Sequence, residues 1–455
     1  MLTARTTLSR RVTAALDASP SRIPVLLGGC GSGRTTMLQQ VRERLGRGAV
    51  QYIDVERTAT TPERFLRAIT AVSPFPVTDS SASTPTGARA AFDAALGFFG
   101  RVRSAASEPA TFLLDEFLEL RTFESFPGLR RVQHDFVEGL SSSSNRFVLT
   151  SRYTARALRL LRDRSARFEV IHMPALTTED SLDILGPTAA GDAHDADYLA
   201  RTVQSLADGR PAYVRALADE LGTMREHGGP GGGDAISALA ALLAPEGRLA
   251  KQCAFSYELR LHRARGYGAL KAILEILAED EGLTLTEISH RLQRTPGSTK
   301  DYLSWLEDVD LVTSRQKRYS FTDPLLRVWV RLHCRASAAS EDDLAREIHR
   351  YALPRLPPQE APASAPAAAA AGRGERVCGL GRRRRLHREA GQRVAVNLAR
   401  DVVLGRRGGA AVQAHPDAQQ RIGEAVALLP RRDQVDVLQP RQVILRRAWR
   451  ALQPM

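Results

Sequence analysis

Cysteine, lysine and long apolar runs are all scarce in this sequence. The four cysteines lie far apart and include no C-x-x-C pair, so neither a disulfide framework nor a zinc ribbon is indicated. No stretch approaches ~18 consecutive apolar residues, and the first residues lack the apolar block of a signal peptide. We therefore expect a cytoplasmic protein with no membrane segment and about three domains. The sequence leaves the oligomeric state open.

Only four lysines stand against 60 arginines, a bias that is typical of GC-rich coding. Most of the net charge of +13 belongs to the segment from Gly372 onward, which carries 18 arginines and seven acidic residues. The rest of the chain is almost neutral. The charge therefore does not by itself indicate a nucleic-acid-binding protein.

Residues 1–175 alternate short apolar runs with amphipathic stretches, the pattern of an open α/β sheet covered by helices. The predicted strands are residues 24–28, 49–55, 111–115, 146–150 and 168–173. The predicted helices are residues 35–45, 62–72, 87–103, 129–140 and 154–161. This first domain is predicted to be the α/β core.

Three further regions follow. Residues 176–262 show helical periodicity without strands, over 178–185, 196–207, 211–226 and 234–243, and predict a helical lid. Residues 263–335 predict a winged helix, with helices at 268–280, 286–292 and 298–308, a hairpin of 311–313 with 318–321, and a last helix at 322–335. Residues 336–455 predict a linker and a disordered Arg/Ala-rich tail. A shifted reading frame would explain the abrupt change of composition equally well.

The strongest motif is a glycine-rich loop between the first predicted strand and the first predicted helix. It fits G-x-x-x-x-G-K-[S/T] at every fixed position except one, where Arg34 replaces lysine. Backbone N–H groups of such a loop, with the helix N-terminus, surround phosphates. The residues predicted to bind nucleotide are Gly28, Gly29, Cys30, Gly31, Ser32, Gly33, Arg34, Thr35 and Thr36. Thr35 is predicted to bind Mg²⁺. Arg34 keeps the positive charge that would contact the phosphates, but carries it on a planar, forked guanidinium instead of a compact ammonium group. A simple strand-to-helix turn is the alternative.

A second motif ends the strand predicted at 111–115 with two adjacent acids. Asp115 is suited to hold Mg²⁺, and Glu116 to polarise an attacking water. The alternative is that both acids cap the next helix. Thr150 and Arg152 end the following strand at the same sheet edge, where they are predicted to sense the γ-phosphate. A solvated surface arginine is the alternative for Arg152.

With these motifs the chain resembles the AAA-related STAND group of P-loop ATPases, and within it the archaeal-type ATPases with a C-terminal winged helix. Residues 149–152 are similar to the sensor strand of that group, 209–211 to its G-x-P element, and 319–329 to the segment that closes the winged helix. The resemblance implies a sheet of order 5-1-4-3-2, ATP with Mg²⁺, and Pro211 near the adenine. It also implies slow hydrolysis used as a conformational switch.

The winged helix has two interpretations. Its predicted recognition helix carries three acids and one lysine, which argues against deep insertion into a DNA groove, whereas the wing carries Arg315, Lys317 and Arg318. Trp305 and Leu306 have the helical spacing of core residues. DNA contact and protein docking therefore both stay open. The favoured function is an ATP-dependent switch, and the alternative is a DNA-binding regulator with a vestigial nucleotide site.

Overall fold

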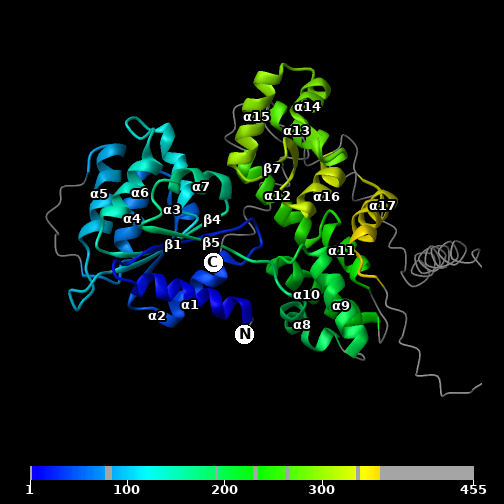
Figure 1. Cartoon of the computed structure of the whole chain (residues 1–455), viewed down its shortest axis with the longest axis horizontal. Helices are drawn as coiled ribbons and strands as arrows, with labels where there is room; N and C mark the ends of the chain where they lie inside the picture. Colours follow the sequence, from blue (N-terminus) through cyan, green and yellow to red (C-terminus); the bar gives the residue numbers. More distant parts are fainter. Residues whose placement is uncertain are drawn as a thin grey trace, which may run out of the picture. The chain divides into compact units, whose positions relative to one another are not determined.

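The computed structural model describes residues 3–76, 85–189, 193–228, 234–261, 266–334 and 339–358. The predicted Arg/Ala-rich tail lies outside these residues. The described chain begins with an α/β core, continues through a group of helices, and includes a smaller domain with a three-stranded sheet (Figure 1).

The core contains a five-stranded parallel sheet. Its strands are β1 (Ile23–Leu27), β2 (Val50–Asp54), β3 (Thr111–Asp115), β4 (Arg146–Ser151) and β5 (Phe168–His172). They lie in the order β2-β3-β4-β1-β5, which confirms the predicted order 5-1-4-3-2. Every residue of β1 and β3 is buried, because helices cover both faces of the sheet. Because all five strands run parallel, their carboxyl ends lie at the same edge of the sheet.

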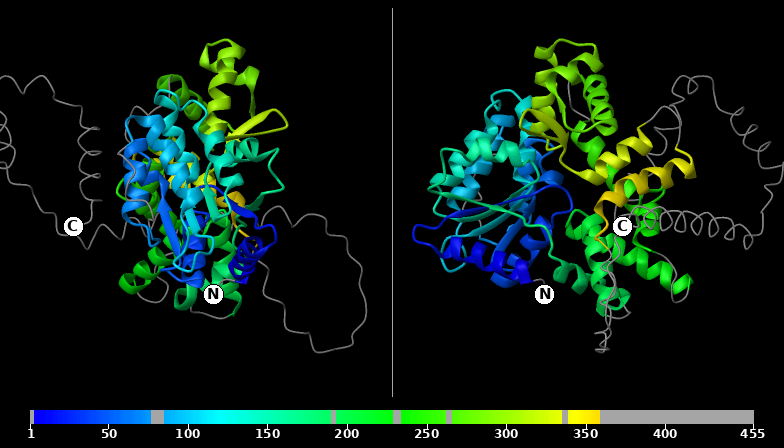
Figure 2. Two further views of the ribbon diagram at one scale, coloured as in Figure 1. Left: turned by 90° about the vertical axis from the view of Figure 1, so that its left-hand side faces the viewer. Right: turned by 45° about the vertical axis from the view of Figure 1, so that its right-hand side comes forward.

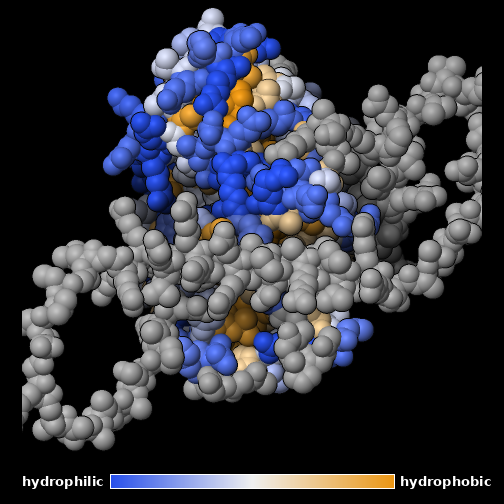
Figure 3. Space-filling model, turned by 90° about the vertical axis from the view of Figure 1, so that its right-hand side faces the viewer, coloured by the Kyte–Doolittle hydropathy of each residue, from blue (hydrophilic) through white to orange (hydrophobic). Residues whose placement is uncertain are grey.

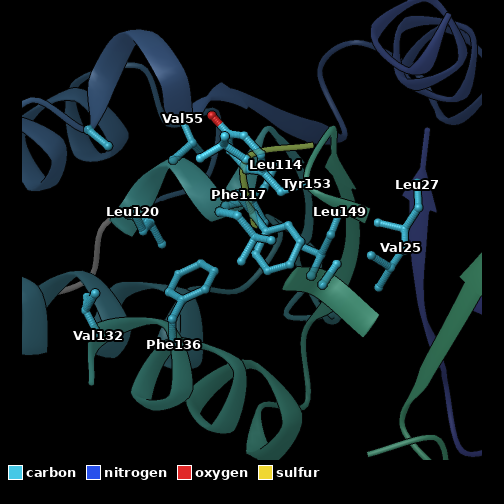
Figure 4. Close-up of a cluster of buried hydrophobic side chains, with 14 of the residues drawn as sticks. Val25, Leu27, Val55, Leu114, Phe117, Leu120, Val132, Phe136, Leu149 and Tyr153 are labelled. Carbon is cyan, nitrogen blue, oxygen red and sulfur yellow. The ribbon is translucent and has the colours of Figure 1, made fainter. Parts of the chain in front are cut away.

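Helices cover the two faces of this sheet (Figure 1, Figure 2). On one face lie α1 (Thr3–Asp17) and α2 (Arg34–Leu45), whose apolar side chains pack on Leu26. On the other face Val25 and Leu27 join a larger aromatic cluster, part of which Figure 4 shows. The elements of that face are α3 (Val55–Thr58), α4 (Pro62–Ala71), α5 (Ala88–Arg101), the 3₁₀ helix η1 (Phe117–Ser125), α6 (Val132–Ser142) and α7 (Thr154–Leu161).

The helix α1 was not predicted, because threonine, serine and arginine interrupt its apolar pattern. Its buried residues Leu8, Val12 and Leu16 nevertheless follow one another at four-residue spacing, which places them on one helix face. That spacing is the signal that sequence reasoning could have used.

The described residues of the predicted lid form five α-helices and one short 3₁₀ helix. They are α8 (Thr178–Leu185), η2 (Gly186–Ala189), α9 (Ala193–Leu206), α10 (Pro211–Gly228), α11 (Ala235–Leu243) and α12 (Arg248–Leu261). Local sequence sets several helix starts: Thr177 and Asp180 form a capping box at α8, and Pro211 is the first residue of α10. The helix α12 is an addition to the four lid helices that the sequence predicted.

The winged helix follows the predicted pattern closely. Its elements are α13 (Tyr267–Glu279), β6 (Leu283–Thr284), α14 (Leu285–Leu292), α15 (Pro296–Asp308), β7 (Val312–Arg315), β8 (Arg318–Phe321) and α16 (Pro324–His333). Gln316 and Lys317 form the turn of the wing, with φ of 52° and 64°, the left-handed values of a two-residue hairpin turn. Leu306 is fully buried and Trp305 packs against the core, as expected for both.

The interval predicted as linker contains a further helix, α17 (Glu341–Ala352), followed by the short η3 (Leu353–Arg355). Ser340 and Asp343 form its capping box, and Ile348 and Tyr351 pack into the apolar cluster of the lid. The Tyr351 hydroxyl donates to the carbonyl of Leu206 at 2.8 Å. The start of the predicted linker is therefore a packed helix, which corrects that part of the prediction. The domain boundaries themselves stay a prediction.

Among the described residues no helix is long and apolar enough to cross a membrane. The face shown in Figure 3 carries mainly hydrophilic side chains, with smaller apolar areas between them.

Candidate functional site

The glycine-rich loop 28–35 connects the buried end of β1 to the first turn of α2. Gly31 and Gly33 have φ of +77° and +83°, a left-handed conformation that side chains with a Cβ rarely adopt. A Cβ on Gly28 would lie 2.8 Å from the Ser32 hydroxyl oxygen, so a larger residue here would displace the Ser32 side chain. The loop thus has the backbone of a phosphate cradle, and the free N–H groups of the α2 N-terminus complete it.

The guanidinium of Arg34 lies inside this loop. Its Nη1 donates to the carbonyl of Gly29 at 2.5 Å and to the hydroxyl of Ser32 at 3.1 Å, and it also contacts the carbonyl of Gly28. Its Nη2 donates to Glu116 Oε1 at 2.5 Å. The side chain is only 7% exposed. Arg34 therefore links the loop directly to the acid that follows β3.

Asp115, the last residue of β3, is also buried and hydrogen-bonded. Its Oδ2 accepts from the Tyr52 phenol at 3.0 Å, and its Oδ1 accepts from the Thr150 hydroxyl. The Thr150 oxygen in turn accepts from the N–H of Glu116 at 3.0 Å. Burial and the neighbouring Asp115 carboxylate raise the pKa of Tyr52 above its ordinary value, so the phenol stays a donor. Thr150 positions both acids of the second motif.

Glu116 is the centre of a buried chain of charges. It has a left-handed backbone with φ of 54°, and its Oε2 accepts from the backbone N–H of Arg152 at 3.0 Å. The Nε of Arg152 lies 3.1 Å from the same oxygen, and its Nη2 contacts Glu56. The order along the chain of charges is Arg34, Glu116, Arg152 and Glu56.

The pKa values along this chain follow from burial and charge. Burial alone would raise the pKa of Glu116, but the guanidinium groups of Arg152 and Arg34 outweigh it and lower the pKa to about 2. Burial raises the pKa of Glu56, and the attraction of Arg152 opposes this rise only in part. Glu116 is therefore ionised throughout the physiological range.

The predicted residues of the glycine-rich loop and of the ends of β3 and β4 are thus brought together at one sheet edge, where Arg34 and Arg152 both pair with Glu116. Arg152 is 7% exposed and pairs with Glu116 and Glu56, so the surface alternative for it is wrong. Thr35 and Thr36 are exposed in the first turn of α2. Pro211 lies beside Gly33 and Thr36 in a pocket of about 80 Å³. That Pro211 lies near a bound adenine stays a prediction.

The lid contributes an arginine that sequence reasoning did not assign. Nη1 of Arg210 donates to the carbonyl of Cys30 and to Oδ2 of Asp323, both at 2.9 Å, and Nη2 donates to the carbonyl of Thr322 at 2.8 Å. The hydroxyl of Tyr213 donates to the same carboxylate oxygen at 2.6 Å. Arg210 therefore holds the glycine-rich loop and the winged helix at once.

A second lid arginine makes a parallel connection. Arg260 of α12 donates through Nη2 to the sulfur of Cys30 at 2.7 Å and through Nη1 to the carbonyl of Asp310 at 2.7 Å. Burial raises the pKa of the Asp310 carboxyl to about 6, although Arg260 and Arg210 oppose the rise. Asp310 precedes β7 of the winged helix. No single motif could have shown these contacts, because they join segments up to 230 residues apart.

Comparison with known proteins supports this architecture. Residues 269–313 match the family model described as winged helix-turn-helix DNA-binding. Among solved structures, the Walker-type ATPase PABY2304 of Pyrococcus abyssi is 17% identical, with 72% of this chain and 95% of that chain covered and a TM-score of 0.51. No curated protein matches the sequence.

Two further solved structures are more distant. The Aeropyrum pernix ORC1 protein in complex with DNA is 16% identical over 78% of this chain and 93% of that one, with a TM-score of 0.38. A Thermotoga maritima RuvB variant is 13% identical over 70% and 91%, with a TM-score of 0.37.

The sheet order, the loop and the match to the Pyrococcus ATPase define the fold as that of a P-loop ATPase. The domain that follows the lid is a winged helix.

Proposed function

We propose that the chain binds ATP with Mg²⁺ at loop 28–35, hydrolyses it slowly, and uses the nucleotide to control the winged helix, as in the STAND group that its motifs resemble. The observation that carries this proposal is the glycine-rich loop beside a strand that leads into two acids, with Arg34 joined to Glu116 at 2.5 Å. Such a pair of motifs at one sheet edge is the common arrangement of P-loop nucleotide sites.

The oxygen groups present fit a magnesium ion. Thr35 supplies an exposed hydroxyl at the start of α2, and Asp115 supplies a carboxylate at the end of β3. Oxygen ligands of this kind, with phosphate and water, are what Mg²⁺ prefers in proteins. When bound, Mg²⁺ neutralises phosphate charge. Tyr52 and Thr150 hold the Asp115 carboxylate in place by their hydrogen bonds.

The environment of Glu116 supports slow rather than fast turnover. Its carboxylate is ionised and can accept a proton from water, but a pKa of about 2 makes it a weak base at neutral pH. Two arginines already bind its two oxygens, so fewer of its lone pairs are left to accept a hydrogen bond from water. Both effects lower the rate without preventing binding.

The contacts of Cys30 supply the connection to the winged helix. Its carbonyl and its sulfur are each bound by a lid arginine, and each arginine also binds a winged-helix oxygen. A nucleotide that changes the position of the loop must alter these contacts. Differential contact in the bound and free states is what shifts a conformational equilibrium.

Nucleotide binding by the full chain tests this function. We expect saturable uptake of MgATP, measured by titration with labelled nucleotide. Thr35→Ala should weaken the Mg²⁺-dependent part of the affinity by about 10–100-fold, the range typical of changes at a metal site. The matched control is Thr70→Ala, because the Thr70 hydroxyl bonds only to carbonyls of its own helix. Absence of saturable uptake would refute the proposal.

A second candidate function is DNA binding through the winged helix. The family match at residues 269–313 favours it. A shallow, wide-open depression of about 680 Å³ lies at the turn between α14 and α15, lined by residues that include His290, Arg294 and Ser298. The wing exposes Arg315 and Lys317. These groups could neutralise backbone phosphates, which supply most non-specific affinity for DNA.

Charge removal on the wing tests DNA binding. In the double variant Arg315→Gln, Lys317→Asn, the slope of log affinity against log salt should shrink by about 0.9 for each phosphate that the wing no longer neutralises. Asparagine tolerates the left-handed backbone of Lys317, whose φ is 64°. The control is Arg44→Gln, Arg47→Gln at the end of α2. Equal affinity and equal slope for wing variant and wild type would exclude DNA contact by the wing.

A further inference from the structure

The sulfur of Cys30 has an unusual environment for a cysteine in a phosphate loop. It lies 2.7 Å from Nη2 of Arg260 and 3.3 Å from the hydroxyl oxygen of Ser256, both on lid helix α12. Arg260 is 3% exposed, whereas Cys30 itself is only partly buried. A buried guanidinium therefore faces the sulfur of a partly buried cysteine.

The surrounding charges favour the thiolate. Burial would raise the pKa of Cys30, but Arg260, Arg152 and Arg34 together lower it below the ordinary 9.0. The other two cysteines within the described residues behave in the opposite way: burial raises the pKa of Cys334 to about 11, and that of Cys253 well above its ordinary value. Of these three thiols, Cys30 is thus the one whose surroundings favour the thiolate.

Two buried polar atoms of the residues around this part of the loop lack hydrogen-bond partners among the described residues. They are Nε of Arg260 and Oδ2 of Asp310. A Cβ on Gly29, the neighbour of Cys30, would lie 3.7 Å from that Asp310 oxygen, so the carboxylate points toward the loop. Buried groups of this kind are costly unless a partner satisfies them. One atom is a donor and the other an acceptor, so a small polar group on the sulfur could satisfy both.

We propose that Cys30 is an oxidation site, at which a hydroperoxide converts the thiol to a sulfenic acid that Arg260 and Asp310 hold. A sulfenic acid carries one O–H donor and oxygen lone pairs, which match the unmet groups of these two residues. In the reaction the thiolate sulfur attacks a peroxide oxygen. The S–O bond forms as the O–O bond breaks, the sulfur loses two electrons to the peroxide, and the departing hydroxide, or the alkoxide of an organic hydroperoxide, takes a proton from solvent.

Because Cys30 lies in the glycine-rich loop, its oxidation should affect nucleotide binding. This part of the inference rests on the proposed ATPase function. The added oxygen would occupy space in the phosphate loop and engage Arg260, which also holds the Asp310 carbonyl of the winged helix. Oxidised protein should therefore bind MgATP more weakly than reduced protein. Bound nucleotide should conversely shield the sulfur.

The experiment treats the full-length Cys378→Ser chain with hydrogen peroxide, traps sulfenic acid with dimedone, and measures labelling of each cysteine by mass spectrometry against pH. The charged groups around Cys30 are Arg34 and Arg152 of the core and Arg210 and Arg260 of the lid, and the carboxylate of Asp310 faces the neighbouring Gly29. We expect Cys30 to be labelled at least about 10-fold faster than Cys334 near neutral pH, because each pKa unit changes the thiolate fraction tenfold.

Variants of α12 separate this chemistry from folding. Arg260→Gln should slow labelling of Cys30 and move its pH midpoint upward, whereas Arg260→Lys should restore most of the rate. The exposed Arg248→Gln on the same helix should change neither quantity. Labelling of Cys30 no faster than that of Cys334, or a rate and midpoint unchanged in folded Arg260→Gln, would overturn the proposal.

Repeating the labelling with MgATP, and the MgATP titration after oxidation, distinguishes this inference from the proposed function. Slower labelling of Cys30 with MgATP, and weaker MgATP binding after oxidation, support both. Fast, Arg260-dependent labelling in a protein that takes up no MgATP would refute the ATPase and leave the oxidation site standing. MgATP binding that neither slows labelling nor weakens after oxidation would refute the link between them.

Discussion

Changing Glu116 to glutamine should lower ATP turnover by about 10²–10⁴-fold, the contribution of a positioned general base. The amide cannot accept a proton from water, although it fills the same volume. MgATP binding should stay within a few-fold of wild type or improve, because Arg34 loses its ion pair with Glu116 and becomes free to contact phosphate. The measurement is phosphate release under saturating MgATP, beside a binding titration.

The control for this result is Glu43→Gln. Glu43 lies on α2, the helix that begins in the phosphate loop, but its side chain is 60% exposed and pairs only with Arg47 on the surface. This control should turn over ATP like the wild type. Unchanged turnover in Glu116→Gln would show that Glu116 serves the ion-pair chain alone, and would leave the proposed hydrolysis without its base.

Changing Arg152 to methionine should lower the free energy of unfolding by about 3–5 kcal/mol, the usual effect of removing one partner from a buried ion pair. Arg152 is 7% exposed and contacts Glu116 and Glu56, so its removal leaves one carboxylate with Arg34 alone and the other without its guanidinium. Urea unfolding at neutral pH measures the change. Arg47→Met, at a site 72% exposed, should cost at most about 1 kcal/mol.

Acid titration of the same network gives an independent check. The folded pKa of Glu116 is about 2, below its ordinary 4.5, so its contribution is complete above pH 4.5 and disappears as the pH falls toward 2. The difference corresponds to about 3 kcal/mol. The gap in stability between wild type and Glu116→Gln should close over this window. Asp310, whose pKa is raised to about 6, acts in the opposite direction in both proteins. A gap independent of pH would mean that Glu116 is not held as a paired carboxylate.

The local motifs of the core could be predicted because each depends on a few consecutive residues. Gly31 and Gly33 allow the left-handed turns of the loop, and the apolar run before Asp115 and Glu116 forms a strand buried on both faces. The hairpin of the wing likewise follows from a short polar turn between two apolar runs. The third wing strand, β6, was missed because two residues carry no periodicity.

The role of the arginines could not be predicted in the same way. Arg34 and Arg152 were expected to face phosphate, yet both bind Glu116, because the strand ends bring three ionisable groups together out of water. Glu56 follows β2, the strand at the edge of the sheet, and becomes a partner only when β2 pairs with β3. In a chain with 60 arginines, composition gives no means of choosing those that are buried.

Sequence alone therefore determined the positions of the strands along the chain, the glycine loop, the acids that follow β3 and the winged helix, since backbone conformation and apolar periodicity are local properties. The order of the strands within the sheet was implied by the family resemblance, and the structure confirmed it. Only the tertiary structure decided which charges pair. Ion pairs such as Arg34 with Glu116, and contacts such as Arg260 with Cys30, join residues distant in sequence. Their strength depends on exclusion of water, which exists only after the sheet, the lid and the winged helix have packed.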